Sequence, residues 1–384
     1  MFDRRLLAAC VASAIAGILL SAFLHSPWSV PSIYSDIGSF WSRSWVSAGQ
    51  VPYSSSGAFL EYPPISGLIL YASRVMGGDY NGYYLAFSII SLWSAAILGW
   101  STWRLAGDLG LRINPFYFIL PTMVIYGVYN FDLFNALFIV LSIQFFVEKR
   151  RNLSALFLGL AVATKLVAIF LLPVFFFDVV GWDKRVRYLV IAALAAAIPF
   201  VPVILANPGF IGQFLSYYRG WGLEDAWYIW IFGNPMSTTA KVFGVVILIP
   251  LILRVYTLKA PIVTRCFLAL SAYFLTSYIY APQFSVALIP LVAVLALNTP
   301  ALFSWEVFNA LIILTWFTLP QTPTSGPTWP WTLPQAMALF RTASLAVLSV
   351  QVASLSGNSL ILWIRRHVGL SGQTTLPTAP SSPA

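Results

Sequence analysis

Charged and amide side chains are scarce in this chain, and several stand where they could do chemistry. Only 9% of the 384 residues are Asp, Glu, Lys or Arg, against about 25% in ordinary soluble domains. Asp36 follows the first apolar run, and a charge near apolar segments is costly enough that it usually has a partner or a function. The other candidates lie in short segments between apolar runs: Glu61, Tyr62, Asn130, Asp132, Lys165, Arg219, Glu224, Tyr280 and Gln283.

Each of these segments also has a purely structural interpretation. Asp36 fits the N-cap of a helix, and 61–64 fits the end of a loop that starts a helix at proline. Segment 129–132 fits a tight turn, since Asx residues suit turns. Lys165 stands within an apolar stretch, where it either has a function or extends its amine to an interface.

The remaining candidates have structural alternatives as well. Arg219 and Glu224 fit an exposed salt bridge, and 280–283 fits a turn that breaks a helix at proline. The sequence has no phosphate-binding glycine loop, no His/Cys metal cluster and no nucleophile elbow. With His25 and His367 as the only histidines, a histidine-based mechanism is disfavoured.

The composition predicts an integral membrane protein. Hydrophobic residues make up 59% of the chain and the mean hydropathy is +0.82. A soluble fold of this size would need a polar exterior, which so few charges cannot supply. The net charge of +9 does not indicate nucleic acid, because the cations gather in short clusters between apolar runs, as the positive-inside rule describes.

Those clusters set the predicted topology, with both termini cytoplasmic and about ten to twelve spans in an all-α fold. The clusters are Arg4/Arg5, Arg104/Arg112, Lys149/Arg150/Arg151, Lys184/Arg185/Arg187, Arg254/Lys259/Arg265 and Arg365/Arg366. The predicted spans are 6–24, 81–103, 115–129, 132–147, 153–164, 167–180, 188–206, 238–256, 263–280, 284–299, 303–319 and 343–363.

Two of these segments, 153–164 and 167–180, are short for ordinary spans, so they predict a tilted or re-entrant hairpin with Lys165 near its tip. With this topology the candidate residues fall on the outer face. Three outer loops are long, covering 25–80, 207–237 and 320–342. The apolar stretch 65–76 in the first of these loops predicts an interfacial helix.

Three regions follow along the chain. Residues 1–300 form the predicted catalytic core, and 301–367 add further spans with a Trp/Pro-rich outer loop. Residues 368–384 form a Ser/Thr/Pro-rich tail that predicts disorder.

Four stretches give the chain a family resemblance. They are 59–64 (FLEYPP), 129–133 (YNFDL), 158–165 (LGLAVATK) and 280–284 (YAPQF). An outer-loop aspartate soon after the first span, as Asp36 is, resembles the GT-C superfamily of membrane glycosyltransferases, and the four stretches, in this order and approximate spacing, carry a closer resemblance. The closer resemblance is to the polyprenyl-phosphate-mannose-dependent, alpha-mannosyltransferase-like family. The Asn-Phe-Asp turn departs from the more usual Asn-Trp-Asp.

The resemblance implies a reaction and its partners. A hexose, mannose by family default, is transferred with inversion from a polyprenyl-phosphate donor to a glycolipid or glycan hydroxyl outside the cell membrane. Asp36 is then the base, and Arg219 and Lys165 bind the donor phosphate. The substrate is bound by Glu61, Tyr62, Asn130, Asp132, Glu224, Tyr280 and Gln283.

Three alternatives stay open at this point. A divalent cation, Mg or Mn, fits Asp36, Glu61 and Asp132 if these lie together. A multi-spanning transporter or lipid flippase fits the span count, although it predicts charges near the bilayer midplane. A membrane scaffold fits the Trp/Pro-rich outer loop, with Pro323, Pro327, Trp329, Pro330 and Trp331 as its surface.

Overall fold

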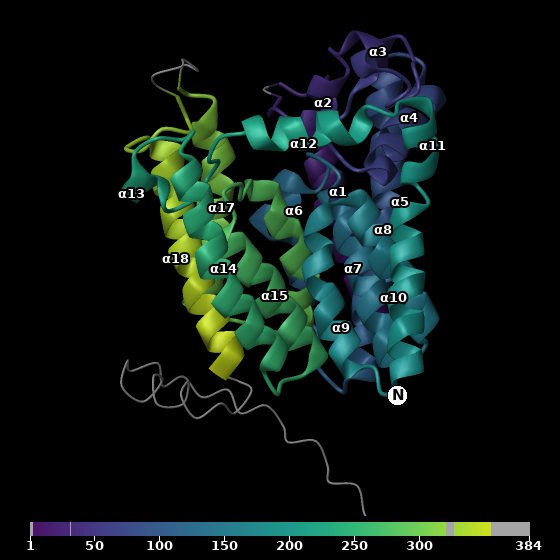
Figure 1. Cartoon of the computed structure of the whole chain (residues 1–384), viewed down its shortest axis with the longest axis vertical. Helices are drawn as coiled ribbons and strands as arrows, with labels where there is room; N and C mark the ends of the chain where they lie inside the picture. The colour runs from purple at the N-terminus through teal and green to yellow at the C-terminus, as the bar shows by residue number, and fades with distance from the viewer. Residues whose placement is uncertain (1–2, 31, 320–325, 355–384) are drawn as a thin grey trace, which may run out of the picture.

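The computed structural model describes residues 3–30, 32–319 and 326–354. Within these ranges the regular structure is helical, and the only strand-like pairing described is an isolated bridge between Glu224 and Ile279. The helices pack into a bundle whose upper end in Figure 1 carries several shorter helices. The predicted all-α class is therefore confirmed.

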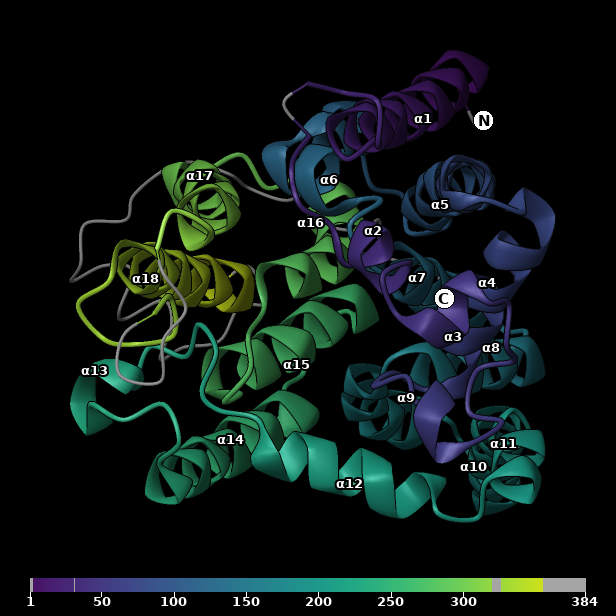
Figure 2. The ribbon, with the colours of Figure 1, turned by 90° about the horizontal axis from the view of Figure 1, so that it is seen from above.

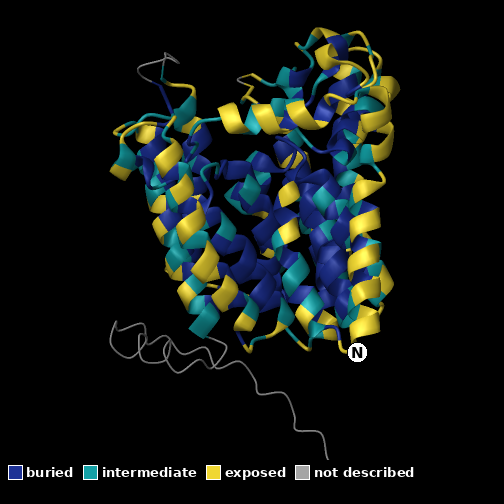
Figure 3. Cartoon of the chain, in the orientation of Figure 1, coloured by how far each residue is buried: buried dark blue, intermediate teal, exposed yellow. Residues whose placement is uncertain are grey.

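Several helices of the described residues are long and apolar enough to cross a membrane. Four pass this test singly, and a pair bent by 42° makes a fifth candidate. They are α1 (Arg4–Leu24), α5 (Tyr80–Asp108), α14 (Thr238–Thr257), α18 (Leu333–Ser354) and the pair α10 (Trp182–Ala197) with α11 (Phe200–Ala206). Many of their exposed residues are large and apolar, as a lipid environment requires, and Figure 3 shows where the outer helices are exposed. The chain is thus a multi-pass membrane protein, and the side on which its termini lie stays a prediction.

Shorter apolar helices fill the bundle between these spans. They are α7 (Asp132–Val147), α8 (Arg151–Thr164), η3 (Leu166–Leu171) with α9 (Leu172–Asp178), α15 (Ile262–Thr276), η4 (Pro282–Leu288) with α16 (Ile289–Leu295), and α17 (Pro300–Trp316). The predicted span 115–129 is instead broken into η2 (Pro115–Ile119) and α6 (Pro121–Tyr126). Pro121 explains the break, since proline is tolerated in the first turn of a helix but not in its interior.

The predicted hairpin at Lys165 is confirmed. Lys165 is extended, with φ −154° and ψ 125°, and separates α8 from η3 and α9. Its amine contacts Asp132 at the start of α7. The other ends of the two arms meet near the end of α7, where the rings of Phe146 and Phe175 are 4.9 Å apart. The chain therefore turns at Lys165 and runs back along the bundle.

The end of the bundle near Lys165 carries the short helices. These are α2 (Asp36–Phe40), α3 (Ser44–Ser47), η1 (Ser56–Ala58), α4 (Pro64–Gly77), α12 (Phe210–Gly220) and α13 (Ile229–Phe232). α4 includes the predicted interfacial stretch and packs against α5. Gly77 is required in this packing, because a Cβ there would lie 2.1 Å from the backbone of Gly82.

α12 lies across the end of the bundle, from the end of α11 toward the top of α14 (Figures 1 and 2). Tyr218 fixes it there by donating a hydrogen bond of 2.8 Å to the carbonyl oxygen of Glu61. The predicted loop 207–237 is thus partly helical. The predicted loop 320–342 is shorter than expected, since α18 begins at Leu333, and residues 320–325 and the predicted tail lie outside the described residues.

Candidate active site

A cavity of about 390 Å³ opens at the end of the bundle that α12 crosses. Segments far apart in sequence line it, including α2, the 61–62 segment, the Lys165 turn, α12 and the turn before η4. Its polar lining residues are Tyr34, Asp36, Ser39, Arg43, Glu61, Tyr62, Tyr129, Lys165, Tyr217, Tyr218, Trp221, Glu224 and Gln283. Apolar side chains such as Phe40, Phe284 and Phe317 complete the lining, so the cavity combines polar groups with an apolar wall.

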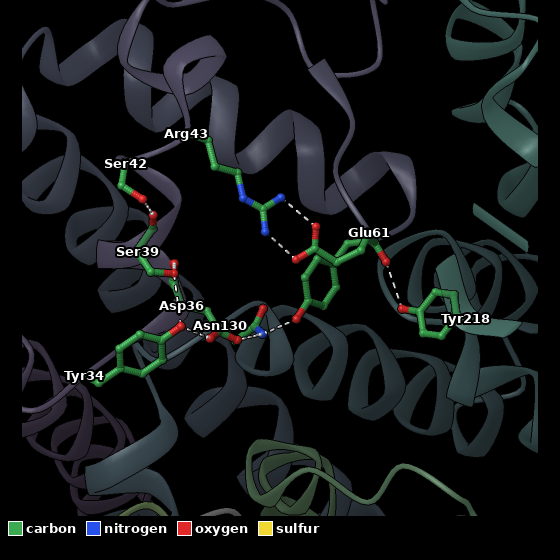
Figure 4. A network of polar contacts seen from close by, with 9 residues as sticks. Tyr34, Asp36, Ser39, Ser42, Arg43, Glu61, Asn130 and Tyr218 are labelled. Carbon is green, nitrogen blue, oxygen red and sulfur yellow. Dashed lines mark hydrogen bonds and ion pairs between the residues drawn. The ribbon is translucent and has the colours of Figure 1, made fainter. Parts of the chain in front are cut away.

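Asp36 occupies the first turn of α2 and faces this cavity. Ser35, not Asp36, caps the helix by accepting a hydrogen bond from the Gly38 amide, so the capping interpretation of Asp36 is wrong. The Asp36 carboxylate accepts hydrogen bonds from the Tyr34 hydroxyl at 3.1 Å and from the Asn130 amide at 2.7 Å (Figure 4). Both donors are neutral, and no cation among the described residues is bonded directly to this carboxylate.

Burial raises the pKa of Asp36 to about 7. The protein around the carboxyl replaces water, and the negative charges of Glu61 and Glu224 add to the shift. The Tyr34 hydrogen bond and the charge of Lys165 act in the opposite direction. A carboxylate with a pKa near neutrality can accept a proton from a substrate hydroxyl and still be ionised at physiological pH.

Asn130 belongs to the predicted turn between α6 and α7, and its side chain forms hydrogen bonds with two residues that line the cavity. Its amide nitrogen donates to Asp36 and, at 2.6 Å, to the Tyr62 hydroxyl, while its side-chain oxygen accepts from the Phe131 amide. Asn130 is fully buried and does not line the cavity. The structural interpretation of segment 129–132 as a turn is therefore correct. The turn also fixes the side chains of Asp36 and Tyr62, which line the cavity.

Arg43 is the arginine that lines the cavity. Its guanidinium forms a bidentate pair with Glu61, with both N–O distances 2.6 Å (Figure 4). It also lies over the Phe40 ring, 4.6 Å from the centroid. A guanidinium fixed by two parallel hydrogen bonds and a ring keeps one orientation. Its remaining N–H groups are available for an anion in the cavity.

Lys165 supplies a second cation from the hairpin turn. Its Nζ is 2.6 Å from one carboxylate oxygen of Asp132, and it lies 3.9 Å above the centroid of the Phe284 ring. The two side chains are 9% and 2% exposed, so this pair is buried. Lys165 lines the cavity, whereas Asp132 stands behind it. The interpretation that Lys165 only reaches an interface is therefore wrong.

Glu224 enters the cavity from the segment after α12. Its backbone amide donates to the Tyr278 carbonyl and its carbonyl accepts from the Tyr280 amide, which fixes the segment against the 278–280 strand-like stretch. Its carboxylate accepts a hydrogen bond of 2.8 Å from the Trp221 indole. Burial and the adjacent Asp225 raise the pKa of Glu224 to about 7.

The structure brings most of the predicted site residues to one place. Asp36, Glu61, Tyr62, Lys165, Glu224 and Gln283 line the cavity. Asn130, Asp132 and Tyr280 are buried directly behind lining residues. Arg219 is exposed near the end of α12 and does not line the cavity. Sequence reasoning gave Arg43 no role, although its place on the same loop as Asp36 and Glu61 was a usable signal.

The three carboxylates that the divalent-cation alternative required are not assembled. Asp36, Glu61 and Asp132 each have a different partner, namely Asn130, Arg43 and Lys165. Among the described residues, no group of three or more His, Cys, Asp or Glu side chains is placed to hold a metal ion. These three carboxylates as arranged therefore do not fit the Mg or Mn alternative.

A buried polar network lies beneath the cavity, and sequence reasoning missed it. Arg341 of α18 is fully buried and donates to the carbonyl oxygens of Asp225, at 3.2 Å, and Tyr280, at 2.7 Å. Gln335, about one and two-thirds turns earlier on the same helix, donates to the Asp225 carboxylate at 3.1 Å. These bonds tie α18 to the two segments that carry Glu224 and Gln283.

Comparison with known proteins gives a structural likeness. No protein-family model and no curated protein matches the chain. Among solved structures, the chain is similar to the crystal structure of ArnT from Cupriavidus metallidurans bound to undecaprenyl phosphate. The identity is 13% over 90% of this chain and 77% of that chain, with a TM-score of 0.48. The sequences are far apart, so the assignment of an activity rests on the cavity itself.

Proposed function

We propose that the chain is an integral membrane glycosyltransferase. It would transfer a hexose, mannose by family resemblance, from a polyprenyl-phosphate donor to an acceptor hydroxyl on the extracytoplasmic face, with inversion. The observation that carries this proposal is the cavity in which Asp36, with its raised pKa, shares the lining with Lys165 and Arg43. A base and fixed cations are the two groups that such a transfer requires.

Asp36 acts as the general base in this mechanism. Its carboxylate takes the proton of the acceptor hydroxyl as that oxygen forms a bond to the anomeric carbon. The bond from the anomeric carbon to the phosphate oxygen breaks at the same time, and the lipid phosphate leaves with the electron pair. Tyr34 and Asn130 hold Asp36 in place through neutral hydrogen bonds, which leaves it basic.

Lys165 and Arg43 stabilise the phosphate that leaves. Fixed cations in a site that excludes water are effective at this task because they need no reorganisation as charge develops. Both line the cavity, and both are already oriented by a carboxylate partner. Arg219 belongs to α12, which borders the cavity through Tyr217 and Tyr218, so we move its proposed role to the cavity entrance.

The remaining polar lining residues bind the sugar. Glu61, Tyr62, Glu224 and Gln283 offer acceptors and donors for sugar hydroxyls from three different segments. Tyr280 acts as a positioning residue, since its backbone amide is bonded to the Glu224 carbonyl.

The test is sugar transfer from a short-chain polyprenyl-phosphate-mannose to endogenous membrane lipids, in matched membranes. The variants are Asp36→Asn and, as a control, Glu306→Gln, which alters a buried carboxyl of α17 outside the cavity. Asp36→Asn keeps the size of the side chain and an acceptor for Asn130, so folding is preserved. Loss of the base should lower the transfer rate roughly 10²- to 10⁴-fold.

The outcomes separate the parts of the proposal. Activity in the wild type and in Glu306→Gln, with loss in Asp36→Asn, supports the enzyme and its base. If Asp36→Asn is still active, the proposal of a glycosyltransferase stands, but the base must be another carboxylate. Glu224 is then the next candidate. No transfer from any polyprenyl-phosphate sugar would overturn the proposal and favour a transporter.

A further inference from the structure

A second cavity of about 390 Å³ lies at the other end of the bundle from Asp36. It is formed where α7 turns into α8 and where α10 begins. Five of its lining side chains are cations, namely Lys149, Arg150, Arg151, Lys184 and Arg187, and no acidic side chain lines it. We call this cavity the basic pocket.

Two of these cations have partners within the protein. Arg151 donates to the Phe146 carbonyl and lies over the Phe146 ring, 3.4 Å from its centroid. Arg150 is 3.8 Å from Glu148, a carboxylate that also pairs with Arg104 at 3.4 Å. These contacts orient the two guanidinium groups but neutralise little of the charge of the pocket.

The other three cations have no carboxylate within 4.0 Å among the described residues. Lys149, Lys184 and Arg187 are all exposed, and Asp183, which precedes Lys184, does not line the pocket. Cations that share one cavity without counter-ions repel each other. An anionic ligand would relieve this repulsion.

Two helix N-termini add to the positive potential. α8 begins at Arg151 and α10 begins at Trp182, and neither helix has a side-chain cap. The first backbone N–H groups of a helix have no partner within it, and the helix dipole places partial positive charge there. Phosphate groups bind well to such ends.

The surface beside the pocket is apolar. α10 leaves Val186, Leu189, Val190 and Leu194 exposed along its length. Trp182 is 70% exposed at the start of the same helix, where an indole suits the membrane interface. A ligand with a phosphate at one end and hydrocarbon at the other matches both surfaces, whereas free phosphate matches only the pocket.

We propose that the basic pocket binds the headgroup of an anionic membrane phospholipid, whose acyl chains lie along α10. This site is separate from the cavity of Asp36, and the proposal does not depend on glycosyl transfer. The pocket is formed in part by the first residue of α8, whose last residue precedes Lys165. A bound lipid would therefore hold the base of the hairpin that carries Lys165.

Lipid binding to the purified full chain in detergent, measured by native mass spectrometry, tests the proposal. Phosphatidylglycerol and phosphatidylcholine are titrated separately into the wild type, Lys149→Gln/Arg187→Gln and Arg254→Gln/Lys259→Gln. The second double variant removes the same charge from exposed cations that do not line the pocket.

The wild type and the Arg254/Lys259 variant should bind phosphatidylglycerol more tightly than phosphatidylcholine. The Lys149/Arg187 variant should lose roughly tenfold or more in affinity for phosphatidylglycerol, since each cation near a membrane surface contributes a severalfold factor. Equal binding of both lipids by the wild type, or equal losses in both double variants, would overturn the proposal. Complete displacement of the lipid by millimolar inorganic phosphate would also overturn it, because the apolar contacts would then contribute nothing.

If the Lys149/Arg187 variant does not fold, the affinities of the wild type for the two lipids still test the proposal. The single change Lys184→Gln, at an exposed position, then replaces the double variant, with Lys259→Gln as its control.

Discussion

The buried pair of Lys165 and Asp132 gives the sharpest test of the site. Their side chains are 9% and 2% exposed, the contact is 2.6 Å, and the second oxygen of Asp132 has no hydrogen-bond partner among the described residues. Lys165→Met would leave an uncompensated buried carboxylate. Breaking such a pair from one side costs about 3–5 kcal/mol. We expect this variant to be both unstable and inactive.

The double variant Lys165→Met/Asp132→Asn separates the loss of stability from the loss of activity. It removes both charges and replaces them with side chains of similar size, so most of the stability should return. The cation for the leaving phosphate is still missing, however. Loss of a fixed group that stabilises transition-state charge costs roughly 10²- to 10³-fold in rate, and we expect transfer to stay reduced by that factor.

The assay pairs thermal unfolding in detergent with initial rates of transfer in matched membranes. Asp108→Asn serves as a control, because it alters an ion pair, Arg104–Asp108, whose side chains are 40% and 18% exposed. Such exposed pairs contribute about 0–1 kcal/mol. If the double variant regains the wild-type rate, Lys165 is only the counter-ion of Asp132 and its proposed role with the phosphate is refuted.

Three further predictions concern neighbouring groups. The transfer rate should rise with pH through about 7, because the pKa of Asp36 is raised to about 7 and the ionised form is the base. The pH–rate profile of Glu224→Gln should still show a rise in rate with pH. Arg43→Lys should lower kcat/KM roughly tenfold, since an ammonium cannot reproduce the bidentate bond to Glu61, which a steady-state comparison would show. Burial also raises the pKa of Asp225 to about 7, so folding favours its protonated form, and the stability that this gives is lost as pH rises from about 4 to about 7; Asp225→Asn should flatten the fall of the unfolding temperature over that range.

Much of the fold follows from local pattern. α7 has the predicted bounds 132–147, and α1, α5 and α14 differ from prediction by a few residues. Uninterrupted apolar runs of this kind leave the chain few alternatives in a membrane. The turn at Lys165 was also predictable, because the apolar segments on either side are short and a lysine within hydrocarbon is costly.

Other parts depend on tertiary contacts that a single sequence does not reveal. α12 lies in a predicted loop, and it is held across the bundle by Tyr218 and by Tyr278, which donates to the Tyr218 carbonyl at 3.0 Å. The position of α12 exposes Arg219, so the predicted phosphate ligand is not in the cavity. Arg341 falls at the edge of a predicted loop, yet it is fully buried. Which arginine faces a site is decided by packing and not by composition.

The arrangement of charge in the cavity explains why Asp36 suits the role of base. Each lining cation comes with its own carboxylate, Glu61 for Arg43 and Asp132 for Lys165. These pairs keep the cations fixed and direct their hydrogen bonds to other carboxylates, so the effect of Lys165 on the pKa of Asp36 is smaller than that of burial. If one cation were bonded directly to Asp36, the pKa of that carboxyl would fall and its basicity with it. Separate counter-ions therefore allow one small cavity to hold both a basic carboxylate and two groups for a phosphate.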